Sequence, residues 1–129
     1  MHHRHQIIIA DESADNGAIL AKCLRQEGFG VDVATDNERL MALLGCRPSL
    51  AVIASEFSTV APSAAEHLRR IRCIPRLRRL PVVIIAERDD PADRLAAFKG
   101  GADAYLVKPV STRELALRVR AILRRADAA

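Results

Sequence analysis

The chain has 129 residues, of which 50% are hydrophobic and 28% are charged. This length and apolar content suit one globular domain with a single core. The longest apolar runs are only a few residues, whereas a membrane-spanning helix needs roughly 20, so we expect no membrane span. The amino terminus lacks the apolar stretch and cleavage site of a secretory signal, which predicts a cytoplasmic protein.

The formal net charge of +4 at pH 7 comes almost entirely from arginine. Six arginines crowd one short stretch, at Arg69, Arg70, Arg72, Arg76, Arg78 and Arg79. Binding of nucleic acid through such a stretch usually needs stacking aromatics or a recognition helix as well, and aromatic residues are only 3% of the chain. Direct nucleic-acid binding is therefore not expected, and a solvated face or a contact with an acidic partner is the simpler interpretation.

The cysteines and histidines do not form a recognisable metal or redox motif. The three cysteines lie far apart without CxxC spacing, at Cys23, Cys46 and Cys73. We expect them to be buried or half-buried apolar side chains. Three of the four histidines belong to the amino terminus, at His2, His3 and His5, which we interpret as a flexible tail. The fourth, His67, is expected to be an exposed helical residue.

The first predicted strand covers residues 7–10, and its helix starts near Asp15 and stops at Gly28. The inward face of this helix is expected to carry four side chains, Ile19, Leu20, Cys23 and Leu24. Residues 31–33 alternate apolar and polar, which favours an edge strand with one solvated face. Asp36 can then cap a helix that ends at Gly45. The side chains of that helix predicted to pack inward are Leu40, Leu43 and Leu44.

Residues 50–54 form an apolar run without polar alternation, which favours a central strand buried on both faces. A helix is predicted from about residue 62 to 72. Residues 81–86 are a second central strand, and Asp90 followed by Pro91 predicts the capped start of the next helix.

The last pair is a strand at 104–107 and a helix from about 111 to 125, with Ser111 and Glu114 as a capping box. The core positions predicted on this helix are Leu115, Val119, Ile122 and Leu123. We therefore expect one domain at 6–125, a flexible tail at 1–5 and a tail or linker stub at 126–129.

Four segments, taken in order, resemble the successive motifs of response regulator receiver domains. They are IIIADE at 7–12, PSLAVIA at 48–54, PVVIIA at 81–86 and GGADAYLVKP at 100–109. The last is the most specific, because a glycine turn, an aromatic strand and a Lys-Pro step seldom coincide before a capped helix. The resemblance covers nearly the whole chain. It implies a flavodoxin-like (βα)5 doubly wound α/β fold with a parallel sheet in the order 2-1-3-4-5 and a site at the carboxyl ends of the strands.

The resemblance also implies roles for individual residues. Asp11 and Glu12 match the acidic pair that helps to hold Mg²⁺. Out of context they would be ordinary helix-start acids, but the resemblance favours a remnant metal site. Lys108 matches the lysine that bonds the acceptor carboxylate and then the phosphoryl group, and we expect it to pair with Asp11 or Glu12. The phosphoryl acceptor should be an aspartate at the end of the third strand, but Ala54 stands there. A methyl group has no lone pair for attack on phosphorus.

The switch positions of the family are also altered. The serine or threonine that ends the fourth strand is replaced by Ala86. Tyr105 matches the aromatic that rotates on activation, but it also fits an ordinary half-buried strand tyrosine. Pro109 completes the Lys-Pro step, which we expect to be of the cis type. Glu56, two residues beyond Ala54, is the fallback carboxylate near the site.

These substitutions predict a degenerate receiver domain, not an enzyme, that works by phosphorylation-independent protein contacts. It needs no cofactor, and any Mg²⁺ binding is weak. The docking face implied by the resemblance is the fourth helix, fifth strand and fifth helix, and its partner is a signalling protein or a second copy. The cations expected to be exposed there are Arg94, Lys99, Arg113, Arg118 and Arg120.

Two alternatives remain from the sequence. One is a phosphorylatable receiver that uses Glu56 or Ser55 as an unusual acceptor, and the other is a regulatory module of a larger DNA-binding or enzymatic regulator. Small-molecule catalysis ranks last, because the chain shows no Ser-His or Cys-His pairing and no glycine-rich phosphate loop.

Overall fold

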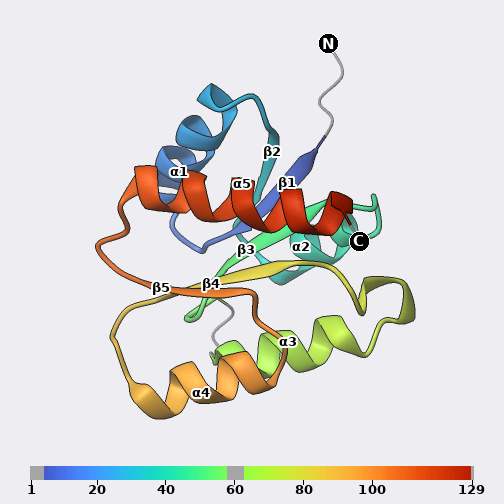
Figure 1. Ribbon diagram of the computed structural model, residues 1–129, viewed down its shortest axis with the longest axis vertical. Coiled ribbons are helices and arrows are strands. Elements are labelled where there is room, and N and C mark those ends of the chain that lie inside the picture. Colours follow the sequence, from blue (N-terminus) through green and yellow to red (C-terminus); the bar gives the residue numbers. More distant parts are fainter. Residues whose placement is uncertain (1–4, 58–62, 129) are drawn as a thin grey trace.

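The computed structural model describes residues 5–57 and 63–128. It shows a parallel sheet with helices on both faces (Figure 1). The strands are β1 (Gln6–Ala10), β2 (Gly30–Ala34), β3 (Leu50–Ala54), β4 (Val82–Ala86) and β5 (Ala104–Val107). The helices are α1 (Ala14–Gln26), α2 (Asn37–Leu44), α3 (Ala64–Arg72), α4 (Pro91–Lys99) and α5 (Thr112–Ala128), with a short 3-10 turn η1 (Pro75–Leu77) before β4.

The strand order is β2-β1-β3-β4-β5, and every neighbouring pair is parallel. The predicted fold class is therefore confirmed. β2 is an edge strand with a half-buried Asp32, as its alternation indicated, whereas β3 and β4 are buried along their whole length. Successive side chains of a strand point to opposite faces, so the sheet contributes to two cores.

One core lies between the sheet and α1 with α5, and the other lies between the sheet and α2, α3 and α4 (Figure 1). In β1, Ile7 and Ile9 belong to the first core, while Ile8 belongs to the second.

The helix starts and turns between the strands follow the local sequence signals. Asp36, Asp90 and Ser111 accept hydrogen bonds from backbone amides of the helices that they precede. Gly28 ends the α1 turn with a φ of +95°, which a glycine adopts without strain.

Several predicted details were wrong. Ile19 is 59% exposed, because the buried stripe of α1 is Gly17, Leu20, Ala21 and Leu24, and Ile19 lies beside that stripe. Cys46 and Cys73 are exposed, since they follow the ends of α2 and α3, and only Cys23 is half-buried.

The two ends of the described chain differ from the predicted tails. α5 continues to Ala128, three residues beyond its expected end at Arg125. Of the predicted amino-terminal tail, residues 1–4 lie outside the described residues. His5 is described, and its Nε2 lies 3.2 Å from the Asp127 carboxylate near the end of α5. Among the described residues, no helix is long and apolar enough to cross a membrane.

Candidate functional site

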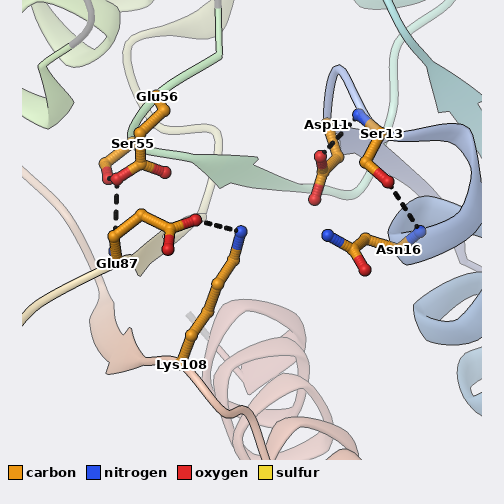
Figure 2. Close-up of polar contacts among 7 residues, drawn as sticks. All are labelled: Asp11, Ser13, Asn16, Ser55, Glu56, Glu87 and Lys108. Atoms are coloured by element: carbon orange, nitrogen blue, oxygen red, sulfur yellow. Dashed lines mark hydrogen bonds and ion pairs between the residues drawn. The ribbon is translucent and has the colours of Figure 1, made fainter.

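Polar side chains follow the carboxyl ends of four strands. Asp11 follows β1, Ser55 and Glu56 follow β3, Glu87 follows β4 and Lys108 follows β5. Because the strands are parallel, all these ends meet at one edge of the sheet, and Figure 2 shows the side chains gathered there. The edge therefore combines one cation with several carboxylates.

Lys108 makes its ion pair with Glu87, because its Nζ lies 2.7 Å from Glu87 Oε1 (Figure 2). The expected pairing with Asp11 or Glu12 was therefore wrong. Burial by itself would lower the pKa of the Lys108 ammonium. The hydrogen bond to Glu87 and the negative charges of Asp11, Glu87 and Glu56 outweigh burial and raise this pKa. Lys108 is thus a fixed cation at this edge at neutral pH, and the Lys108–Pro109 peptide bond beside it is cis.

Glu87 is the site residue that sequence reasoning missed. It directly follows Ala86, the last residue of β4. In a parallel sheet, the residue after each strand lies at the same edge, so an acid in that position is a signal for a partner of Lys108. The family motif assigns a role to the position of Ala86 and none to that of Glu87, so the resemblance alone does not point to Glu87.

Asp11 supports the start of α1. It is buried, with 6% of its surface exposed, and its Oδ1 accepts a hydrogen bond of 2.9 Å from the Ser13 amide. Ser13 in turn caps α1 by accepting from the Asn16 amide (Figure 2). Glu12 is exposed. Asp11 therefore stabilises the segment that leads into α1, as a helix-start acid does.

The described residues do not supply a full protein ligand set for a divalent metal. Among residues 5–57 and 63–128, no group of three or more histidine, cysteine or acidic side chains is arranged to hold a metal ion. One Asp11 oxygen is engaged by the Ser13 amide, and the ammonium of Lys108 lies at the same edge. Mg²⁺ prefers octahedral oxygen coordination, which these carboxylates alone do not complete.

Glu56 links the ends of β3 and β4 through hydrogen bonds. Its Oε1 accepts hydrogen bonds from the Ser55 hydroxyl at 2.6 Å and from the Glu87 amide at 3.2 Å. Ala54, two residues earlier, ends β3 beside Ile85 of β4 and is 6% exposed. The end of the central strand therefore presents a methyl group, and the nearest carboxylate along the chain is already hydrogen-bonded.

A hollow of about 250 Å³ lies beside these groups, between the ends of β3, β4 and α4. Ala86, Glu87 and Tyr105 are part of its wall. Tyr105 is buried, so the half-buried interpretation was wrong, and the guanidinium carbon of Arg94 lies 4.9 Å from its ring centre. Burial and the nearby charge of Asp93 raise the pKa of the Tyr105 hydroxyl, against the opposite effect of Arg94.

The expected exposed cations of α4 and α5 divide into three environments. Lys99, Arg113 and Arg118 are exposed, as predicted. Arg94 is half-buried over Tyr105 and pairs with Asp89 at 3.0 Å. Arg120 is also exposed, as predicted, but it lies on the side of α5 that faces α1. It pairs with Glu27 beyond the end of α1 at 2.5 Å, because α5 packs beside α1.

Comparison with known proteins identifies the family. A family model for the response regulator receiver domain matches residues 7–120. The chain belongs to the response regulator receiver domain family.

Curated relatives of this receiver domain include two transcriptional regulators. One is the transcriptional regulatory protein CpxR of Klebsiella pneumoniae, 33% identical over 121 residues, which are 94% of this chain and 50% of that protein. Another is the phosphate regulon transcriptional regulatory protein PhoB of Rhizobium meliloti, 36% identical over 120 residues, or 92% of this chain and 52% of that protein. The receiver domain thus spans about half the length of these relatives.

Solved structures agree with the fold of the receiver domain. A two-component response regulator from Clostridium difficile superimposes with a TM-score of 0.85 at 26% identity, covering 95% of this chain and 98% of that one. A CheY-like receiver domain protein from Methanospirillum hungatei gives a TM-score of 0.85 at 19% identity, covering 96% and 97%. The second likeness shows the fold alone.

His67 of the receiver domain is buried, contrary to expectation. It lies on the inner side of α3 with 4% of its surface exposed, and its ring centre is 6.0 Å from that of Phe57. The helix turns this position inward together with Ala64, Leu68 and Ile71. Its Nε2 atom has no hydrogen-bond partner among the described residues. Burial lowers the pKa of the His67 imidazole, against the opposing effect of hydrogen bonding to the backbone of Ser55 and Phe57.

This lowered pKa predicts an acid-sensitive contribution to stability. The unfolded chain binds the proton near the usual pKa of 6.5, whereas the folded chain binds it only at lower pH. Stability from this group is therefore present above pH 6.5 and is lost as the pH falls. Glu66 and Arg70 are the charged neighbours that act on the imidazole. The free energy of unfolding, measured with urea, should fall less between about pH 7.5 and about pH 5.5 in His67→Phe than in the wild type. Equal losses in both proteins would contradict this assignment.

Proposed function

We propose that this receiver domain takes part in two-component signalling through protein contacts and without being phosphorylated. The observation that carries the proposal is Ala54 at the carboxyl end of β3. By the family resemblance this is the position of the phosphoryl acceptor, which must be an oxygen nucleophile. A methyl side chain abolishes the covalent step instead of slowing it.

Three further features support the proposal. Ala86 ends β4 in place of the family's switch hydroxyl, so no side chain there can bond a phosphoryl oxygen. Lys108, which would bond the acceptor, is paired with Glu87 instead. Tyr105, at the position of the family's switch aromatic, is buried beneath the guanidinium group of Arg94.

Magnesium binding, if retained, is proposed to be weak and to use Asp11 with Glu12. Asp11 is buried at the site edge and Glu12 is exposed next to it. Without an acid at position 54, water would have to supply most of the coordination, as Mg²⁺ tolerates. No cofactor is required for a function that rests on binding.

A second candidate is phosphorylation at Glu56 or Ser55. Both side chains lie just beyond β3, and the charge of Glu56 helps to raise the pKa of Lys108. However, the Ser55 hydroxyl donates to Glu56 Oε1, and the same oxygen accepts from the Glu87 amide. Either nucleophile would first have to give up these bonds, so we rank this candidate below the first.

The partner surface that we propose is α4, β5 and α5, and a second copy of the chain is one occupant to test. Leu95 and Phe98 are large apolar side chains exposed on α4, three residues apart on the same side of the helix. Lys99, Arg113 and Arg118 add exposed charge on α4 and α5. A partner can shift a conformational equilibrium only by its different affinities for the two states, so signalling would follow partner concentration.

Sedimentation velocity tests this proposal. We expect wild-type self-association to increase with protein concentration and to be unchanged by an acyl-phosphate donor with Mg²⁺. Leu95→Glu with Phe98→Glu should weaken it at least about tenfold, because two charges would be placed in an apolar contact. The matched control, Ile19→Glu with Met41→Glu, changes two equally exposed apolar residues on other helices and should leave association unchanged. Association that the donor strengthens, or that both variants weaken equally, would contradict the proposal.

We further propose that the domain regulates a larger protein. The chain spans about half the length of curated relatives whose names describe transcriptional regulators. The output that such a protein controls would then respond to whatever binds the α4–β5–α5 surface.

A further inference from the structure

A dense group of arginines lies at the opposite edge of the sheet, where the strands begin. Two loops carry it: residues 45–49 lead from α2 into β3, and residues 73–81 lead from α3 into β4. Together they contain Arg47, Arg76, Arg78 and Arg79 and no acidic residue. We call these four residues the arginine edge.

The arginine edge carries positive charge that the fold does not neutralise. All four side chains are exposed. None of them takes part in the ion pairs or side-chain hydrogen bonds that the structure shows among the described residues. By contrast, Arg69 pairs with Glu66, and Arg72 donates to the carbonyls of Leu77, Leu80 and Gly101. Two neighbouring loops therefore bring four guanidinium groups, unpaired among the described residues, to this edge.

The arginine edge also encloses a hollow of about 320 Å³. Its lining combines Arg47, Arg76 and Arg79 with the apolar side chains of Pro48, Leu77 and Leu80. Arg47 has a φ of +56°, a left-handed conformation that favours glycine or asparagine over arginine. An arginine in this strained turn contributes to the wall of the hollow.

We infer that this hollow docks a protein segment rich in aspartate and glutamate that also carries an aliphatic side chain. Guanidinium groups hold carboxylates through paired hydrogen bonds, and the apolar lining would bury the aliphatic group. A nucleic-acid backbone would match the charge but would leave the apolar lining uncovered. The exposed aromatics that single strands use for stacking are also missing from the lining. The inference is independent of the phosphorylation state, because the hollow lies at the far edge from Lys108.

Fluorescence anisotropy with the intact chain tests the inference. The probe is a short fluorescein-labelled peptide of aspartate and glutamate with one central leucine. We expect binding that weakens as salt rises from about 50 mM to about 200 mM. Arg76→Glu with Arg79→Glu should weaken it at least about tenfold, whereas Lys22→Glu with Arg39→Glu changes the net charge equally at other sites and should weaken it less than about twofold.

Two comparison probes test whether the hollow prefers an acidic peptide with an aliphatic side chain over a purely polar peptide or a nucleic acid. The same peptide with serine in place of leucine should bind several-fold more weakly, because the apolar lining is then left exposed to water. A short DNA duplex labelled in the same way should bind more weakly than the leucine peptide. Equal losses in the two charge variants, equal binding of the serine peptide, or tighter binding of the duplex would each overturn the inference. Circular dichroism of both variants confirms that they are folded.

Discussion

Ala54→Asp is expected to give the receiver domain the phosphoryl acceptor that, under the proposed function, the wild type lacks. The change places a carboxylate at the end of β3, at the same edge as Asp11 and Lys108. Its oxygen would attack the phosphorus of an acyl-phosphate donor, the donor's carboxylate would leave, and an aspartyl phosphate would remain. The added acid also supplies an oxygen ligand that the wild-type edge lacks for Mg²⁺. Intact mass spectrometry after incubation with the donor and Mg²⁺ measures the gain.

Ala54→Asn is the matched control, because it has nearly the same shape but no nucleophilic carboxylate. It should show no mass gain. Ala54 is largely buried, so both variants should lose some stability, and circular dichroism must confirm that they are folded. Adding Glu87→Ala to Ala54→Asp should increase the yield, since Lys108 is then released to the new carboxylate. A folded Ala54→Asp protein that stays unmodified would show that the rest of this edge is not a usable receiver site.

Leu68→Ala is expected to remove about 2–5 kcal/mol from the free energy of unfolding, because it leaves a cavity in a packed core. Leu68 is 0% exposed on the inner side of α3. Its side chain packs closely against Gly100, just beyond the end of α4. Small domains are stable by only about 5–15 kcal/mol, so this loss is a large share.

Leu95→Ala makes the same chemical change at a helical leucine that is 56% exposed. Its effect should stay within about 0.5 kcal/mol, since little burial is lost and alanine favours helix. Urea unfolding of both variants at one pH measures the difference. Similar losses in the two variants would mean that α3 does not pack on the sheet as described.

The fold was predictable because its signals are local and repeated. Continuous apolar runs identified β3 and β4, alternation identified the edge strand β2, and Asp36, Asp90 and Ser111 identified helix starts. Each signal depends on neighbours within one turn or strand. Helices, strands and caps that depend on such short-range signals can be predicted without knowing the tertiary contacts.

Two of the errors concern contacts between distant segments. Lys108 pairs with Glu87, and Arg120 with Glu27, and these partners are 21 and 93 residues apart. His67 was expected to be exposed, but the hydrophobic spacing of Ala64, Leu68 and Ile71 places it on the buried side. That spacing was available in the sequence, so its burial could have been predicted.

We propose that the wild-type edge cannot hold a covalent phosphoryl group. Incubation of the folded wild-type chain with an acyl-phosphate donor and Mg²⁺, followed by intact mass spectrometry, tests it directly. We expect the mass of the wild-type chain to stay unchanged under conditions in which Ala54→Asp is modified. A stable gain of one phosphoryl group on the wild type, mapped to Ser55 or Glu56, would contradict it.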